Sequence, residues 1–322
     1  GGGFPLDFGS RLNSMKDRPE LWSGAKDIWG WVARQGTVEG LTMVDFNYPQ
    51  HLEGCKEEEA KYALASAGLK AGAICMRFPK EMQAGAFTHP EASVRQQAID
   101  LTIEGGKWAK ALGATELVIW SAYCGYDYHF QADYQVLWDR VKLAFQQVCD
   151  AHPDLKVSLE FKPTDENTRF FAIPTTGAAM LLANQVDRPN FGLTLDFGHL
   201  LMCGENPAQS VAMVGGAGKL FGIQLNDGYG RGEDGLMFGS VHTNMAFELV
   251  YWLQKTKFAG HIYFDTFPRN EDPVKEAEYN IRKFKSLWHK ANHLRELGVE
   301  KTMGKQDALG SLLLVDKALG SE

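Results

Sequence analysis

Short apolar runs alternate along the chain with longer segments in which apolar residues recur every three or four positions. The short runs are rich in β-branched and aromatic residues and predict eight strands, over Leu6–Leu12, Leu41–Asn47, Ala71–Phe78, Glu116–Ala122, Lys156–Phe161, Phe191–Phe197, Phe221–Leu225 and His261–Phe264. The longer segments predict eight helices, over Leu21–Arg34, Lys56–Ala67, Ser93–Leu112, Tyr134–Ala151, Thr175–Gln185, Pro207–Val214, Thr243–Lys257 and Val274–Leu294. Strand and helix therefore alternate eight times, with no Pro/Ser-rich linker or charge block between them.

This alternation predicts a single α/β domain, a (β/α)8 TIM barrel over residues 1–294. An open dinucleotide-binding sheet is disfavoured because no GxGxxG opens a helix after the first strand. Residues 295–322 fall outside the repeat, and their apolar stretch Leu309–Ala318 predicts one further helix. We expect this C-terminal helical extension to pack on the barrel or on a neighbouring subunit of a homodimer or homotetramer.

Composition argues against two classes of partner and indicates a cellular compartment. The 322 residues carry a net charge of −7 and no basic block, so a nucleic-acid partner is not expected. Five cysteines without a CxxC or similar spacing indicate reduced thiols and a cytoplasmic protein. No apolar run approaches the ~18 residues that span a bilayer, and we therefore expect no membrane partner.

Polar residues follow the apolar part of four successive predicted strands. In the fifth strand, Glu160 and Lys162 lie two residues apart and therefore point to the same side. The sixth, seventh and eighth strands reach Asp196, Gln224 and Asp265 at corresponding depth, and His199 lies three residues beyond Asp196. In a parallel barrel the chemistry collects where strands end, so these groups form the candidate active site.

Converging buried carboxylates repel one another unless protons or cations neutralise them. A divalent metal ion is the simplest neutraliser for this set. Carboxylate and amide oxygens favour Mn²⁺ or Mg²⁺, whereas an imidazole favours Mn²⁺ or Co²⁺. The sequence therefore predicts a divalent-metal site, with Mn²⁺ as the expected ion and Mg²⁺ or Co²⁺ as alternatives.

The same segments resemble the xylose isomerase-like TIM-barrel superfamily over about Leu6 to Leu294. The most specific matches are the segments Glu160-Phe161-Lys162-Pro163, Asp196-Phe197-Gly198-His199 and Phe221-Gly222-Ile223-Gln224-Leu225-Asn226-Asp227. In character the chain is most similar to the L-rhamnose isomerase and D-apiose isomerase members. The family usually has Asp or His where this chain has Gln224.

The resemblance implies a role for each of these positions. It implies metal ligands at Glu160, Asp196, Gln224 and Asp265. It also implies a second ion held by His199 with an acid of the following glycine-rich loop, for which we select Asp234, with Asp227 or Glu233 as alternatives. It also implies that Lys162 lies near the substrate carbonyl. The catalytic set is then Lys162, Glu160, Asp265 and His199.

Loops after the early strands are expected to bind the substrate. The candidates are Arg11, Asn47, His51, Arg77 and Trp120, with Asn226 after the seventh strand. Trp120 offers an aromatic face to sugar C–H groups, and His51 titrates near neutrality.

The resemblance implies a divalent-metal-dependent aldose–ketose isomerase, an intramolecular oxidoreductase that acts on a small unphosphorylated sugar such as D-apiose, another pentose or a deoxyhexose. Lys162, and an aspartate rather than a glutamate at position 265, favour isomerisation. Two alternatives stay open on the same barrel, a ketose 3-epimerase and a sugar-acid or inositol-type dehydratase. The third alternative is a barrel that binds sugar without turnover.

Overall fold

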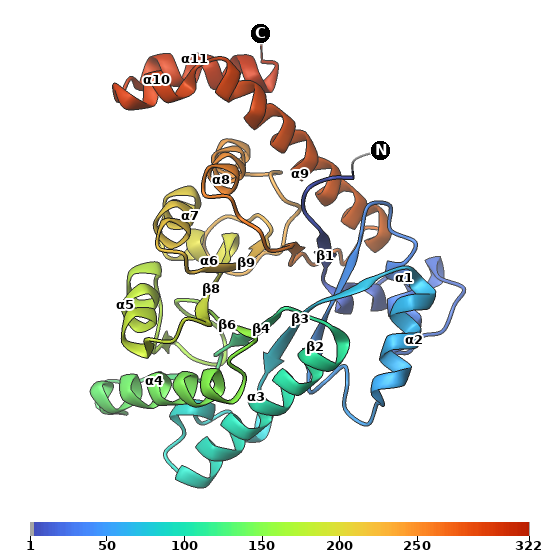
Figure 1. Ribbon diagram of the computed structural model, residues 1–322, viewed down its shortest axis with the longest axis vertical. Coiled ribbons are helices and arrows are strands. Elements are labelled where there is room, and N and C mark those ends of the chain that lie inside the picture. The colour runs from blue at the N-terminus through green and yellow to red at the C-terminus, as the bar shows by residue number, and fades with distance from the viewer. Residues whose placement is uncertain (1–2, 322) are drawn as a thin grey trace.

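Eight parallel strands form the barrel in the computed structural model, which describes residues 3–321 (Figure 1). Their order around the sheet is β1-β10-β9-β8-β6-β4-β3-β2. Their bounds are β1 Phe8–Ser10, β2 Met43–Tyr48, β3 Lys70–Arg77, β4 Glu116–Trp120, β6 Lys156–Glu160, β8 Phe191–Asp196, β9 Leu220–Leu225 and β10 Ile262–Phe264. The predicted (β/α)8 TIM barrel is confirmed.

Thr42 closes the seam between the first and last strands of this order. Its amide donates to the Phe8 carbonyl at 3.0 Å, and its hydroxyl oxygen accepts from the Phe8 amide at 2.9 Å. One threonine thus continues the hydrogen bonding between β1 and β2 just before β2 begins, and the barrel has almost no free edge.

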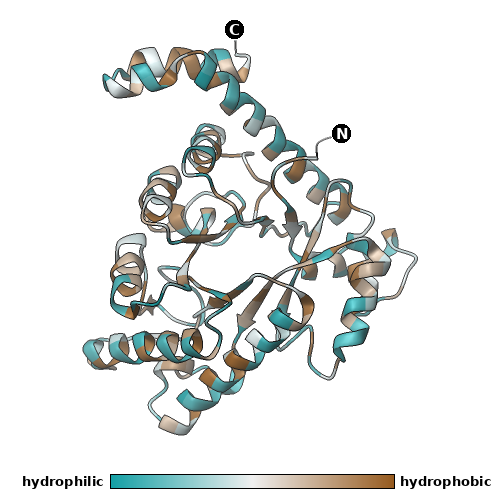
Figure 2. Cartoon of the chain, viewed as in Figure 1, coloured by the Kyte–Doolittle hydropathy of each residue, from teal (hydrophilic) through white to brown (hydrophobic). Residues whose placement is uncertain are grey.

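Helices surround the strands and turn their apolar stripes inward (Figure 2). Their bounds are α1 Ile28–Gln35, α2 Glu57–Ala67, α3 Ala92–Leu112, α4 Tyr134–Ala151, α5 Thr176–Val186, α6 Phe197–Met202, α7 Pro207–Gly216, α8 Thr243–Lys255 and α9 Pro273–Glu296. The first helix begins later than the pattern predicts. Asp27 accepts a hydrogen bond from the Gly30 amide and caps it, while the preceding Ser23-Gly24 pair is not helical.

Two short strands lie outside the barrel and were not predicted. β5 (Gly125–Tyr126) and β7 (Phe170–Phe171) pair antiparallel, and so join the loop after β4 to the loop after β6. Tyr126 stacks on Phe170 with ring centroids 5.2 Å apart. The pairing fixes two loops on the side of the barrel where the strands end.

Polar residues fill part of the barrel interior near the start of the strands. His261 donates to both carboxylate oxygens of Asp45 at 2.9 Å, and Glu116 accepts from Ser158 and Thr194 at 2.8 and 2.9 Å. Burial opposes protonation of His261, yet Asp45 raises its pKa to about 9. The pair is therefore ionic at neutral pH.

The extension beyond the barrel forms two more helices, α10 (Val299–Gly304) and α11 (Ala308–Leu319), at the end of α9. Glu300 accepts a hydrogen bond from the Tyr251 hydroxyl of α8 at 3.0 Å. Leu309, Leu312 and Leu313 of α11 are 70%, 54% and 55% exposed. The predicted barrel range 1–294 begins in residues 1–2, and the predicted extension 295–322 ends in residue 322. These three residues lie outside the described part of the chain.

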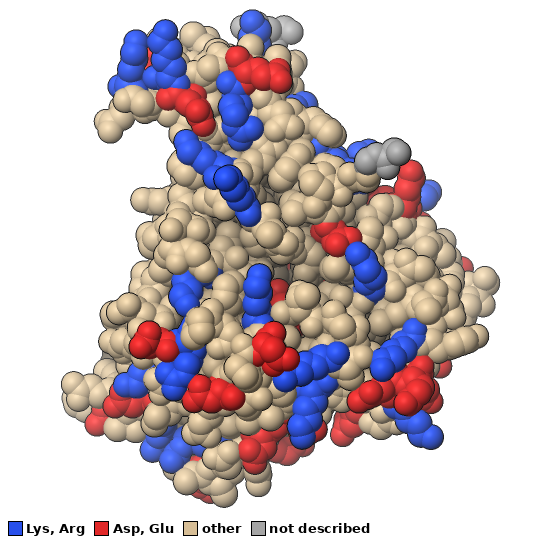
Figure 3. Space-filling view, viewed as in Figure 1, with Lys and Arg blue, Asp and Glu red and all other residues tan. Residues whose placement is uncertain are grey.

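The surface shows basic and acidic side chains interspersed on the face drawn in Figure 3. Across residues 3–321, none of the helices is both long enough and apolar enough to cross a membrane.

Candidate active site

The ends of strands β6, β8, β9 and β10 bring the predicted polar residues to one level of the barrel. Glu160 and Asp196 are the last residues of β6 and β8, and Asp265 follows β10 directly. Gln224 lies opposite Asp196 in the register of β8 and β9, and all four residues are buried. The alternation of side chains along each strand thus places these residues at one level of the barrel.

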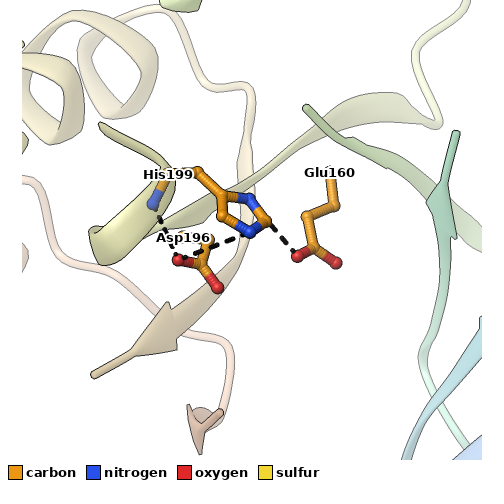
Figure 4. Close-up of side chains that lie close together, drawn as sticks. All are labelled: Glu160, Asp196 and His199. Atoms are coloured by element: carbon orange, nitrogen blue, oxygen red, sulfur yellow. Dashed lines mark hydrogen bonds and ion pairs between the residues drawn. The ribbon is translucent and has the colours of Figure 1, made fainter. Parts of the chain in front are cut away.

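Two groups of side chains are close enough to share a metal ion. Glu160, Asp196 and His199 each offer a ligand atom within 4.8 Å of the others, and so do Asp196, Glu233 and Asp265. Asp196 belongs to both groups. Figure 4 shows His199 between the carboxylates of Glu160 and Asp196.

His199 is held so that one ring nitrogen faces the acids. Its Nδ1–H donates to the Phe161 carbonyl at 3.0 Å, and Nε2 lies 3.4 Å from Glu233 and 3.9 Å from Asp196. Burial opposes the imidazolium, yet Asp196, Glu233 and Glu160 raise the pKa of His199 to about 10. Nδ1 also lies 3.7 Å from Glu160, so the charged ring partly neutralises all three acids.

The carboxylates crowd one another more than one imidazolium can offset. Burial, followed by neighbouring charges, raises the pKa of Glu160 to about 8 and that of Asp265 to about 7. Asp265 Oδ1 is buried and has no hydrogen-bond partner among the described residues. An orphaned carboxylate oxygen beside two more acids and an imidazole fits a divalent ion, which prefers these ligands.

Lys162 lies beside this cluster and is buried. Its Nζ donates to Glu233 at 2.6 Å and lies 3.7 Å from Asp165. Although burial opposes its charge, Glu233 and Asp165 raise the pKa of Lys162. Glu233 in turn bridges Lys162 and His199, and these two cations lower its pKa against the effect of burial. The site therefore holds a charged ammonium whose acidic partner also belongs to the acidic cluster.

A cavity of about 890 Å³ opens over the cluster. Its wall includes Arg11, Arg77, Trp120, Glu160, Lys162 and Asp265 from the predicted site residues. Asn13, a polar residue after the first strand like Arg11, and Glu233, the alternative acid of the glycine-rich loop, also line it. The wall further contains residues that the pattern did not single out, namely Lys16, Asp17, Thr164, Asp165, Glu166, Arg169, Met202, Arg231, Gly232, Phe267 and Arg269. Apart from Met202 at the end of α6, most of these lie in the connections after strands, which carry no periodic signal.

Several predicted residues lie behind the cavity rather than in its wall. Asn226 donates to Asp196 at 3.2 Å and accepts from the Gly198 amide, so it orients a carboxylate. His51 Nε2–H donates to Asn13 at 2.8 Å, and Nδ1 accepts from the Asn47 amide. Burial, followed by nearby cations, lowers the pKa of His51 to about 3. The ring is therefore neutral, with both nitrogens engaged.

The glycine-rich loop after β9 presents a different acid from the one that we selected. Asp234 accepts from the Tyr229 amide at 2.7 Å and closes a turn of the loop. Its neighbour Glu233 is the residue that reaches Asp196 and Asp265. Asp227 accepts from the amides of Val241 and His242 and shapes the same loop. The structure thus brings Glu233, rather than Asp234, into the cluster.

Comparison with known proteins places this geometry in a family. The sequence pattern of the xylose isomerase-like TIM barrel matches residues 35–287. The chain belongs to this family. A xylose isomerase from Thermus thermophilus is 32% identical over 221 residues, which are 66% of this chain and 57% of that protein. The chain thus matches little more than half of this curated relative's length.

Solved structures of the family share the fold at low identity. An L-ribulose 3-epimerase superposes with a TM-score of 0.71 at 15% identity, covering 91% of this chain and 98% of that one. A D-tagatose 3-epimerase-like protein superposes with a TM-score of 0.70 at 14% identity, covering 88% of this chain and 99% of that one. A D-allulose 3-epimerase from Methylomonas sp. superposes with a TM-score of 0.68 at 18% identity, again covering 88% of this chain and 99% of that one. At these identities the likeness concerns the fold alone.

Proposed function

We propose that the chain is a divalent-metal-dependent aldose–ketose isomerase for a small sugar. The observation that carries the proposal is that Glu160, Asp265 and the buried Lys162 line one cavity, with Asp196 close to both acids. The 32% identity to a xylose isomerase supports the same reaction class. Expected substrates are unphosphorylated pentoses and deoxyhexoses, D-apiose among them.

The residues that would hold the ion form two groups that share Asp196, one with Glu160 and His199 and the other with Glu233 and Asp265. Gln224 lies alongside Asp196. A bound divalent ion supplies Lewis-acid polarisation of a sugar carbonyl. We propose Mn²⁺, because the set combines carboxylates with an imidazole.

The chain's own residues complete the chemistry. Lys162 Nζ donates a hydrogen bond to the sugar oxygen on which negative charge develops, and Glu233 keeps that ammonium charged and oriented. A carboxylate of the cluster, Glu160 or Asp265, exchanges a proton with the sugar hydroxyl, since both line the cavity. Trp120 lies in the cavity wall and offers an apolar face to the sugar.

A ketose 3-epimerase is the second candidate. Glu160 and Asp265 both line the cavity, as a pair of proton-exchanging groups requires. An epimerase inverts a carbon of a ketose and gives another ketose, whereas an isomerase converts an aldose to a ketose.

Assembly and location stay predictions. The exposed leucines of α11, Leu309, Leu312 and Leu313, support packing of residues 295–322 against a second copy, as a homodimer or homotetramer requires. A cytoplasmic location stays a prediction from the cysteine pattern.

Product analysis separates the two reactions. Chelator-treated protein is incubated with aldoses and with ketoses, with and without Mn²⁺, and the products are identified by chromatography. Metal-dependent conversion of an aldose to a ketose supports the proposal. Conversion of ketoses to C3 epimers alone would favour the second candidate.

A further inference from the structure

Four loops each place a basic side chain at the mouth of the cavity. These side chains, which we call the basic collar, are Lys16 after β1, Arg169 after β6, Arg231 after β9 and Arg269 after β10. All four are exposed, and none has a carboxylate within 4.0 Å among residues 3–321. Only two acids of the cavity wall, Asp17 and Glu166, accompany them at the mouth. The collar therefore carries excess positive charge.

The acidic residues deeper in the cavity would not cancel this excess positive charge when a divalent ion is bound, because the ion and the deep cations would neutralise them. Three deep cations, Lys162, Arg11 and Arg77, together with a divalent ion would balance the deep carboxylates of Glu160, Asp165, Asp196, Glu233 and Asp265. The mouth of the metal-loaded cavity is then positive, in a protein whose net charge is −7. Such local focusing of one sign of charge attracts a ligand of the opposite sign.

Arg77 adds a second, independent observation. Its guanidinium lies 4.9 Å from the centroid of the Trp120 ring, inside the cavity, and none of its side-chain N–H groups donates to an acceptor in residues 3–321. The nearest charged groups are the cluster acids, and burial opposes its charge while Asp265 and Glu160 favour it. A planar set of unused donors is suited to a carboxylate, which it can bind with two parallel hydrogen bonds.

The backbone that carries part of the collar is held by the fold. Arg34 of α1 is 1% exposed and donates to the carbonyls of Met15 and Asp17 at 3.0 and 2.8 Å. Ser14 donates to the Thr266 carbonyl at 3.1 Å and so links the loop after β1 to the loop after β10. Two of the four collar residues thus lie on segments that are tied to each other.

A carboxylate fits this mouth better than a phosphate. Phosphate sites usually use backbone amides of a glycine-rich loop or a helix N-terminus. In the glycine-rich loop after β9, the amides of Gly228 and Tyr229 are already bonded to Asp227 and Asp234. These two amides are therefore not available to a phosphate, and the loop offers the side chain of Arg231.

We infer that the sugar bears a carboxylate at the end remote from the metal, so that the substrate class is a sugar acid. The inference rests on the proposed sugar chemistry at the acidic cluster and adds the charge of the substrate. The carboxylate faces the basic collar while the carbonyl end faces the cluster, and Arg77 lies in the wall of the same cavity.

The test measures binding by calorimetry to the Mn²⁺-loaded protein. D-Glucuronate, D-galacturonate and D-mannuronate are each compared with the neutral parent hexose and with its 6-phosphate, and product formation is followed in parallel. We expect at least one uronate to bind about tenfold more tightly than its neutral parent, which corresponds to a binding free energy about 1.4 kcal/mol more favourable. The advantage should shrink in about 0.5 M salt, which screens exposed charges.

Charge-removing variants locate the effect. The double substitution Arg231→Gln and Arg269→Gln should reduce the preference for the uronate several-fold and leave the affinity for the neutral parent unchanged. Lys301→Gln with Lys305→Gln removes the same net charge from exposed positions on the extension and is the matched control. Arg77→Lys keeps the charge but loses the planar donors, so we expect a weaker preference than in the unaltered protein.

Each outcome decides the inference separately from the proposed function. Uronate binding that depends on the collar, without turnover, supports the inference and contradicts the isomerase. Turnover of neutral aldoses with no preference for uronates, or equal losses in the collar and control variants, overturns the inference and leaves the isomerase standing. Tighter binding of the 6-phosphates, or no binding of any uronate, also overturns it.

Discussion

Replacing Asp265 with asparagine tests whether the acidic cluster is built for a cation. Its carboxylate lies within 4.8 Å of those of Asp196 and Glu233, and 4.0 Å from the Arg11 guanidinium. At an effective dielectric constant of about 20, each repulsive pair costs about 3.5 kcal/mol at that separation and the attractive pair returns about 4 kcal/mol. A net repulsion of about 3 kcal/mol is left in the metal-free protein.

Asp265→Asn removes this repulsion and also removes a metal ligand. In chelator at pH 8, where the aspartate is ionised, we expect the variant to unfold at a temperature about 4 °C higher than the unaltered protein, given the unfolding entropy of a chain of 322 residues. With Mn²⁺ at about 100 times its dissociation constant, the unaltered protein should gain about 3 kcal/mol and the variant far less. The stability advantage of the variant over the unaltered protein therefore largely disappears on adding metal.

Calorimetric unfolding with and without Mn²⁺ provides the measurement, and Asp316→Asn, an exposed carboxylate on α11, is the control. The control should follow the unaltered protein in both conditions. The reasoning is refuted if Asp265→Asn is less stable than the unaltered protein in chelator, or if both gain equally from metal.

Four further outcomes follow from the contacts. Lys162→Met should lower turnover about 100-fold with little change in metal affinity measured by calorimetry, because the ammonium stabilises an oxyanion; loss of metal first would make the lysine structural. Glu233→Gln should weaken metal binding while Asp234→Asn leaves it intact, and the reverse result would restore the aspartate as a ligand. Because the pKa of His261 is raised to about 9, its protonation stabilises the folded state by about 3 kcal/mol below pH 6.5, and this stabilisation is lost as the pH rises to about 9. In urea unfolding, the free energy of unfolding of His261→Gln should not show this fall with pH. Arg34→Met leaves carbonyls of the β1 loop without their donor and should cost about 3 kcal/mol and speed hydrogen exchange over residues 11–18; unchanged exchange would contradict this role.

The barrel and the strand-end residues were predictable because both depend on periodicity. A period of two along Val157–Lys162 places Glu160 and Lys162 on one side, and the same rule sets Asp196 and Gln224 at one level. Parallel topology then brings these ends together without further information. The family resemblance and the hydrophobic pattern therefore agree on the same four positions.

Loop residues were harder to predict, since no period fixes where a loop side chain points. The acids Glu233 and Asp234 are adjacent in sequence, and only the turn closed by the Tyr229 amide decides which of them reaches the cluster. The basic collar has the same origin, because its members are far apart in sequence and meet only at the mouth of the barrel.

Hydrogen bonds also determine the role of residues that the sequence places near the site. Asn226 lies at the expected level but is occupied in orienting Asp196. His51 titrates near neutrality in water, yet burial and two hydrogen bonds keep its ring neutral. Such roles depend on neighbours from other strands, which a single sequence does not reveal.

Metal-dependent turnover tests the central claim most directly. Chelator-stripped protein is given a panel of aldoses, including D-apiose, L-rhamnose, D-xylose, D-lyxose and the hexuronates, before and after Mn²⁺ is restored, and ketose formation is measured. The account predicts no conversion without the ion and conversion of at least one aldose to its ketose with it. Conversion that is equal in chelator and in Mn²⁺, or metal binding without conversion of any aldose, would contradict it.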